Sequence, residues 1–186
     1  MREKFSKINF LYQGSAVGFR CDEIILPNKK KASREFLTHR GAVAVIPFLD
    51  SPKNKPLLKC RIVLVEQFRY PVRRITEELP AGKLDKKESL LKCLERELKE
   101  ETGYTTNKFH HLLSYEPTPA FSQEVIHVYW AENLKKGKSC PDEDEFLRTK
   151  IVTFGETLEK IRKGKIRDSK TVAGILAFAV FFINHK

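Results

Sequence analysis

The stretch Gly82–Tyr104, GKLDKKESLLKCLERELKEETGY, decides the fold and carries most of the recognisable chemistry of this chain. Leucines recur in it at helical spacing, at positions 90, 91, 94 and 98, so one face of a helix is expected to contact a core. The spacing of Asp85 and Glu88 is typical of a capping box at a helix start, and Thr102-Gly103 is typical of a helix end. We therefore expect one amphipathic helix between these two signals.

Two glutamates fall on or beside the leucine face of this helix. Glu97 and Glu101 are four residues apart, and Glu100 lies just off the same face. Two carboxylates about 6 Å apart repel by roughly 3 kcal/mol at an effective dielectric of about 20, and one surface salt bridge offsets at most about 1 kcal/mol. Many glutamate-rich helices are simply solvated. Here the leucine register favours a divalent-cation site, because carboxylates are rarely buried without partners.

The same stretch carries a known signature. Gly82, Glu88 and the run Arg96–Tyr104, RELKEETGY, occupy the fixed positions of the Nudix box. The chain therefore resembles a Nudix hydrolase. This resemblance implies an α/β fold, the Nudix-type α/β/α sandwich with a mixed sheet. It also implies that Mg²⁺, with Mn²⁺ as the alternative, binds the Ala81 carbonyl oxygen and the helix glutamates, Glu97, Glu100 and Glu101.

Segments outside the box resemble one branch of the family, the ADP-ribose pyrophosphatases. They are Glu66–Arg69 (EQFR), Glu78–Gly82 (ELPAG) and Thr118–Glu124 (TPAFSQE). The resemblance implies hydrolysis of the pyrophosphate linkage of ADP-ribose or a related nucleoside diphosphate sugar, which yields a nucleoside monophosphate and a sugar phosphate. In one respect the chain departs from the branch, because Ala120 stands where the branch usually has glycine.

The resemblance assigns roles to further side chains. Arg96 is expected to hold the helix glutamates in place. In the acidic segment 142–145, Glu143 is expected to be the base that activates water and Glu145 an additional metal ligand, and a shift of two residues would exchange these roles. The residues expected to contact the substrate are Arg40, Arg69 and Glu124.

Composition and net charge limit the classes of ligand and the cellular compartments that fit this chain. The net charge of +11 favours anionic ligands, but the basic residues are scattered, so we expect a small-molecule nucleotide and no nucleic acid. The start of the chain leads into no apolar signal segment, and the apolar run 172–183 is too short to cross a bilayer. The four cysteines form no CxxC pair, which fits a reducing cytoplasm.

Hydrophobic patterning predicts a mixed set of strands and helices. Residues 27–38 and 135–145 are expected to form loops, and 77–82 an edge strand or an extended segment. A helix is expected from Gly155 through Lys163, followed by an apolar helix capped by Asp168 or Ser169. The predicted strands cover 5–13, 18–26, 41–48, 62–68, 110–115, 125–132 and 150–154.

We divide the chain into residues 1–38, a subregion for dimerisation and base binding, and residues 39–186, the Nudix domain. The resemblance implies that the N-terminal strands exchange between the subunits of a homodimer. Two alternative functions stay open: trimming of the 5′ pyrophosphate of RNA, and nucleotide sensing without cleavage. The second alternative would predict lost glutamates in the box, and none is lost.

Overall fold

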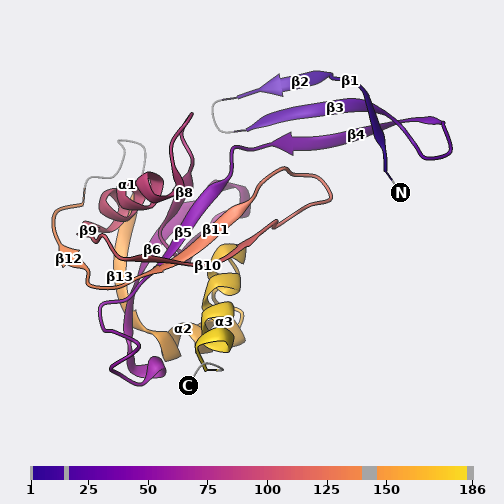
Figure 1. Cartoon of the computed structure of the whole chain (residues 1–186). Helices are drawn as coiled ribbons and strands as arrows, with labels where there is room; N and C mark the ends of the chain where they lie inside the picture. Colours follow the sequence, from indigo (N-terminus) through magenta and orange to yellow (C-terminus); the bar gives the residue numbers. More distant parts are fainter. Residues whose placement is uncertain (1, 15–16, 140–145, 184–186) are drawn as a thin grey trace. The chain divides into compact units, whose positions relative to one another are not determined.

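The computed structural model spans residues 1–186 and describes all of them except 1, 15–16, 140–145 and 184–186. The chain forms two compact units. The first contains residues 1–41 and 116–125, and the second contains residues 42–115 and 126–186 (Figure 1). Residues 116–125 thus belong with the N-terminal segment, although they are distant from it in the sequence.

The first unit is built on an antiparallel sheet with β3 at its centre. Strands β1 and β2 share one edge of β3, and β4 pairs along the whole of the other edge. The inserted segment joins the end of β4, where the backbone N–H of Leu37 donates to the carbonyl oxygen of Phe121 over 2.9 Å. The strands are β1 (Lys4–Lys7), β2 (Phe10–Gln13), β3 (Gly18–Ile25) and β4 (Lys31–Thr38).

The prediction of a loop over residues 27–38 is wrong, because most of this segment forms strand β4. A short turn, in which Lys29 has φ 66°, reverses the chain, and β4 begins at Lys31. Much of β4 is exposed, so it lacks the buried apolar face that reveals a strand in a sequence. Its pairing with β3 is what makes it a strand. The segment expected to be one strand over 5–13 is divided between β1 and β2.

The second unit contains a mixed sheet in the order β10-β11-β5-β8 and an antiparallel sheet in the order β13-β6-β7. Strands β5 and β11 are parallel, and their neighbours in the mixed sheet are antiparallel. The mixed sheet consists of β5 (Ala42–Pro47), β8 (Ala81–Lys83), β10 (Phe109–Tyr115) and β11 (Ile126–Ala131). The second sheet consists of β6 (Arg61–Arg69), β7 (Arg74–Glu78) and β13 (Leu147–Thr153). A short ladder joins β9 (Tyr104–Thr105) to β12 (Lys135–Lys136), and the helices are α1 (Leu90–Thr102), α2 (Phe154–Arg162) and α3 (Ser169–Ile183).

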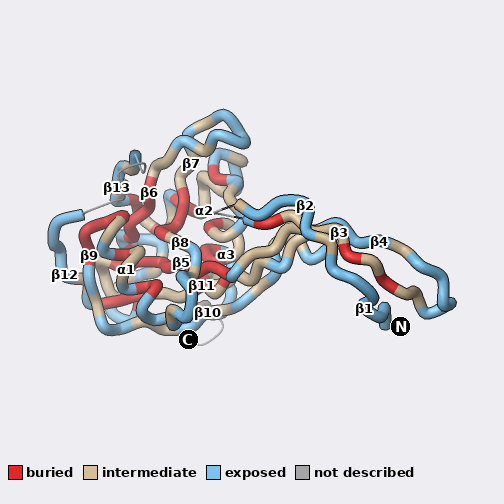
Figure 2. The backbone as a smooth tube through the Cα atoms, turned by 90° about the horizontal axis from the view of Figure 1, so that it is seen from above, coloured by how far each residue is buried: buried red, intermediate tan, exposed pale blue. Residues whose placement is uncertain are grey.

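Strand β5 is the centre of the core. All its residues are buried, because alternate side chains pack against helices on opposite faces. Val43 and Val45 join the cluster that contains Leu98 of α1, whereas Ile46 joins the cluster that contains Phe178 of α3. Figure 1 shows these two helices on opposite sides of the sheet, and Figure 2 shows the buried strands between them. The expected α/β/α sandwich with a mixed sheet is therefore confirmed.

The start of α1 differs from the expectation. The N-cap is Ser89, whose hydroxyl accepts from the backbone N–H of Lys92 over 3.4 Å, and not Asp85. Lys87 has φ 67°, a left-handed conformation that a helix cannot include, so Asp85 and Glu88 form a separate turn. The expected end is confirmed, since Gly103 has φ 74°.

The two remaining helices have well-defined N-termini. Thr153 and Glu156 form a capping box that starts α2 one residue before the expected Gly155. Of the two candidates for the cap of α3, Asp168 accepts from the backbone N–H of Thr171 over 3.0 Å. None of the helices in the described part of the chain is long and apolar enough to cross a membrane.

The leucine face of α1 yields a stability prediction. Leu98 is fully buried, so Leu98→Ala is expected to lower the free energy of unfolding by about 2–5 kcal/mol. Leu91 belongs to the same predicted stripe but is 53% exposed, so Leu91→Ala is expected to change that energy by no more than about 0.5 kcal/mol. Urea denaturation measures both values, and equal losses would contradict the orientation of α1.

Candidate active site

The candidate site lies where α1 packs against β8. The backbone N–H of Ala81 donates to Glu101 Oε2 over 3.0 Å, and Glu101 is only 6% exposed. A Cβ at Gly82 would stand 1.7 Å from Glu97 Oε1, so only glycine leaves room for that carboxylate. Two of the three glutamates expected to bind metal, Glu97 and Glu101, are thus packed against the Ala81-Gly82 segment.

Arg96 connects three carboxylates at this site. Its Nη1 donates to Glu97 Oε1 over 2.7 Å and to Glu100 Oε2 over 3.1 Å. Its Nε and Nη2 each donate to the Glu88 carboxylate over 3.0 Å. These charge-assisted bonds hold the carboxylates close together despite their mutual repulsion, which is the role expected of Arg96.

The titration of these groups follows from the same contacts. The hydrogen bond from Arg96 is the main reason that the pKa of Glu88 falls to about 2, although partial burial opposes the shift. Glu88, foremost among its partners, raises the pKa of Arg96. Below them, burial raises the pKa of the Cys93 thiol to about 12, so this cysteine stays protonated and inert at neutral pH.

The donor set fits a hard divalent cation. Glu97 and Glu101 offer carboxylate oxygens, and Mg²⁺ requires only one or two carboxylates because it keeps waters and binds substrate oxygens. Among the described residues, no three carboxylate, imidazole or thiolate groups converge as a ready-made metal cage. A site that is completed by waters and substrate agrees with this arrangement. The oxygen-only chemistry disfavours zinc, which prefers nitrogen and sulfur ligands.

The other expected site residues are distributed over both units. Glu143 and Glu145 lie outside the described residues. Arg40 and Glu124 belong to the first unit, where Arg40 is exposed and Glu124 Oε1 lies 3.8 Å from His39 Nε2. Arg69 belongs to the second unit, at the end of β6.

Arg69 is held by Glu78, a residue for which the sequence motifs predicted no role. Its Nε and Nη2 donate to the two oxygens of Glu78 over 2.9 and 2.8 Å, and Lys170 of α3 forms a further ion pair with Glu78. Burial alone would raise the pKa of Glu78, but Arg69 and Lys170 outweigh it and lower the pKa to about 2. The position of Glu78 directly before the apolar pair Leu79-Pro80 was the signal in the sequence that could have indicated its burial. No sequence signal pointed to Lys170.

Comparison with known proteins assigns the family. The family model of the NUDIX domain matches residues 38–173, which include the α1 site and both of its flanking segments. This chain belongs to the Nudix family. The resemblance inferred from the box is confirmed. Nudix hydrolases use divalent metal ions, in agreement with the oxygen donors on α1.

Individual Nudix relatives match nearly the whole chain. A protein named methanol dehydrogenase activator, from Bacillus methanolicus, is 39% identical over 175 residues, which cover 93% of this chain and 90% of the relative. A protein named ADP-ribose pyrophosphatase, from Bacillus subtilis (strain 168), is 36% identical over 177 residues, which cover 94% and 91%. A solved structure described as an ADP compounds hydrolase has a TM-score of 0.83 at 16% identity, and it covers 100% of this chain and 96% of its own. That likeness shows the fold.

The Arg96 contacts predict a pH effect. Glu88 has a lower pKa in the folded chain, about 2, than its ordinary 4.5, so its charge stabilises the fold above about pH 4.5. That contribution is lost as the pH falls from 4.5 towards 2. In Arg96→Met, we expect the pKa of Glu88 to return towards 4.5, as measured by carbon NMR of the carboxyl groups. Glu78, held by Arg69 and Lys170, should keep a pKa of about 2 in the same variant; a shift in both would indicate general loosening.

Proposed function

We propose that this Nudix protein hydrolyses the pyrophosphate linkage of ADP-ribose or a related nucleoside diphosphate sugar. The products are a nucleoside monophosphate and a sugar phosphate. The observation that carries the proposal is the pair Glu97 and Glu101, both packed on Ala81-Gly82, with Glu97 bridged to Glu88 and Glu100 by Arg96. The full-length likeness to the Bacillus subtilis ADP-ribose pyrophosphatase supports the substrate class.

We further propose Mg²⁺ as the ion, with Mn²⁺ as the alternative, because both accept oxygen ligands. Glu97, Glu101 and the Ala81 carbonyl would hold it, with Glu100 nearby. When bound, such an ion neutralises phosphate charge and lowers the pKa of a coordinated water. Arg96 keeps the carboxylate of Glu97 in a binding orientation through its 2.7 Å hydrogen bond. Arg69, whose Nε and Nη2 bind Glu78, is proposed to offer its Nη1 to a phosphate oxygen, and Arg40 and Glu124 are proposed to contact the rest of the substrate.

The acidic segment is proposed to complete the site, with Glu143 as the base and Glu145 as a metal ligand. The described chain resumes at Phe146, and Leu147 of β13 pairs with Gln67 of β6, two residues from Arg69. This pairing brings the chain that follows the segment to the strand that carries a proposed substrate contact. Glu143→Gln and Glu145→Gln, compared at saturating Mg²⁺, separate the roles. If neither variant slows the chemical step, the base lies elsewhere.

The first unit supports a homodimer. Its short strands expose large apolar side chains, among them Phe5, Phe10, Leu11 and Tyr12, each more than half exposed. We propose that these strands pair with a second copy of the chain and that their aromatic rings stack the nucleobase. Light scattering distinguishes one 21.6 kDa chain from a dimer, and a monomer at micromolar concentration would contradict the proposal.

The cytoplasm is the location proposed for this protein. The described cysteines, Cys21, Cys60 and Cys93, are free thiols, as a reducing compartment requires. Fractionation of the source cells followed by immunoblotting would locate the chain, and its recovery outside the cytoplasm would contradict the proposal.

A second candidate function is favoured by one comparison. The relative with 39% identity is named methanol dehydrogenase activator. This chain is therefore also a candidate activator of an alcohol dehydrogenase. Adding the chain to such an enzyme and measuring alcohol oxidation tests the candidate, and an unchanged rate with active Nudix protein would exclude that enzyme as a partner.

The metal assignment predicts a strong effect of one substitution. Glu101→Gln keeps an oxygen that can accept from the Ala81 N–H but removes the charge, so the fold should survive. We expect kcat to fall by more than about 100-fold, since residues that merely support metal ligands typically change metal affinity or activity by 10- to 100-fold. Glu95→Gln, exposed on the same helix, is the matched control and should retain activity. A fully active Glu101→Gln would refute the assignment.

The substrate class is tested by comparing kcat/KM over one panel. It contains ADP-ribose, GDP-mannose, an oxidised nicotinamide dinucleotide, a dinucleoside polyphosphate and 5′-triphosphorylated RNA. We expect ADP-ribose to be hydrolysed with the highest kcat/KM. A preference for RNA would replace the proposal with RNA 5′ trimming, and tight binding without hydrolysis of any compound would support nucleotide sensing.

A further inference from the structure

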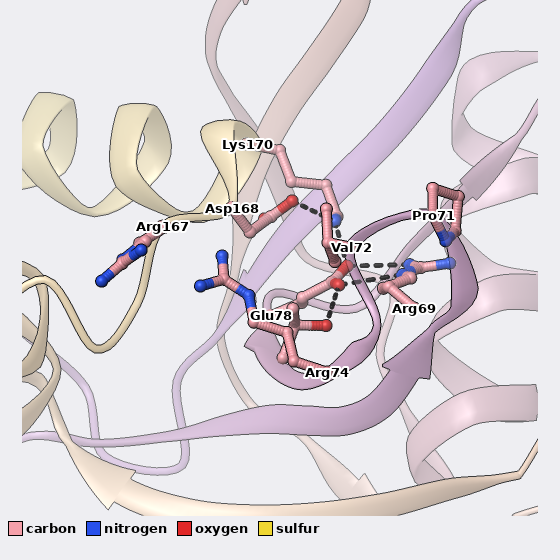
Figure 3. Close-up of a pocket in the computed structure, with 9 residues that line it drawn as sticks. Arg69, Pro71, Val72, Arg74, Glu78, Arg167, Asp168 and Lys170 are labelled. Carbon is pink, nitrogen blue, oxygen red and sulfur yellow. Dashed lines mark hydrogen bonds and ion pairs between the residues drawn. The ribbon is translucent and has the colours of Figure 1, made fainter.

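A cavity of about 320 Å³ opens in the second unit between the β6–β7 hairpin and the start of α3. Six of its lining residues come from the hairpin, and the other three are the consecutive or nearly consecutive residues Arg167, Asp168 and Lys170 (Figure 3). Its volume suits one sugar ring with a charged substituent, and is too small for a whole nucleotide sugar.

The start of α3 is fixed firmly against the strands that form this cavity. The hydroxyl of Thr171 accepts from the buried backbone N–H of Leu79 over 2.8 Å. Asp168 accepts from the same hydroxyl over 2.6 Å and caps the helix. The wall that carries Asp168 and Lys170 is therefore held in place by the β7–β8 connection itself.

The cavity carries a surplus of positive charge. Four of its lining side chains are cationic and two, Glu78 and Asp168, are anionic. Both anions already have partners: Glu78 accepts from Arg69 and Thr76 and pairs with Lys170, which also donates to Asp168 over 2.9 Å. The dashed lines in Figure 3 trace this connected set, which leaves two arginines outside it.

Arg74 and Arg167 are those two arginines. The Arg74 side chain forms no hydrogen bond or ion pair with any residue in the described ranges, and it lies directly opposite Arg69 in the β6–β7 register. Like charges in directly opposed positions destabilise a strand pair. Arg74 therefore destabilises the β6–β7 pairing, and none of its contacts with described residues offsets that effect. Within the same ranges, Arg167 donates only its Nε, to the Gly164 carbonyl over 2.7 Å, and pairs with no carboxylate. Arginines at a protein surface are often only solvated, but these two line one cavity.

The cavity adjoins the candidate metal site. Ala81 lies three positions after Glu78, a chain distance of at most about 11 Å. Glu78 lines the cavity and also binds Arg69, the residue proposed to contact a substrate phosphate. A ligand held by its phosphates at the metal site and Arg69 would therefore have the cavity within reach of one of its end groups.

We propose that this cavity receives the group attached to the nucleoside diphosphate, and that Arg74 and Arg167 select groups with an anion of their own. The preferred substrates are then nucleoside diphosphates linked to a sugar that bears a carboxylate or a phosphate. This inference rests on the proposed function. Arg69, bound to Glu78, contacts the bridging phosphates, whereas the two unpaired guanidiniums remain available to the additional charge.

The test compares two ligands that differ in one group, ADP-glucose and ADP-glucuronic acid. Their dissociation constants are measured by calorimetry on the wild-type protein with Ca²⁺ in place of Mg²⁺, because Ca²⁺ also takes oxygen ligands and the proposed metal ligands, Glu101 included, stay intact. We expect ADP-glucuronic acid to bind about tenfold more tightly, as one charge-assisted contact of about 1.4 kcal/mol provides. Adding Arg74→Gln or Arg167→Gln should bring the ratio of the two constants close to one.

Arg73→Gln is the matched control, because it removes the same charge from the same hairpin. Arg73 lies over the Tyr70 ring, 3.8 Å from its centroid, and does not line the cavity. The Arg73→Gln variant should preserve the tenfold ratio between the dissociation constants of the two ligands. Equal binding of the two ligands, or an unchanged ratio in both Arg74→Gln and Arg167→Gln, would overturn the inference while the proposed function stands. If neither ligand binds, the proposed substrate class is itself wrong and the inference fails with it.

Discussion

The contacts of the Arg96 guanidinium are the constraint on which the candidate site depends. Glu88, Glu97 and Glu100 would repel one another by several kcal/mol if they were brought together without a cation. Arg96 donates to all three, and it does so from within the same helix and its preceding turn. One fixed positive charge therefore holds this set of carboxylates close together.

This arrangement has a steric condition as well as an electrostatic one. Glu97 can lie against β8 only because Gly82 has no side chain, and Glu101 is oriented by the backbone N–H of Ala81. The strand thus supplies space for one carboxylate and a hydrogen bond for the other. Both contacts come from consecutive residues of β8, so a small shift of that strand would disturb both glutamates together.

A second group of charges, centred on the buried Glu78, joins distant parts of the chain. Glu78 ends β7, Arg69 ends β6, and Lys170 lies in the first turn of α3. Replacing a buried ion pair by apolar residues often costs no stability, so such a network is weak evidence for a role in stability alone. Its geometry instead fixes the direction of Arg69 and forms one wall of the adjoining cavity. Helix α3 therefore does more than pack against the sheet, because its Lys170 helps to hold the Glu78–Arg69 pair in place.

The sequence by itself determined the family, the layered α/β/α fold, the end of α1 and the close placement of Glu97, Glu100 and Arg96, because each depends on local spacing. Helical periodicity sets which residues of one helix are neighbours, whatever the rest of the chain does. The tertiary structure alone decided that β4 is a strand, that α1 starts at Leu90, and that Glu78 meets Lys170. These depend on pairing or contact between segments as far as 92 residues apart, and on a left-handed Lys87 that no pattern marked. Hydrophobic periodicity predicts which face of an element is buried. It does not predict which distant cationic side chain will form an ion pair with a buried carboxylate.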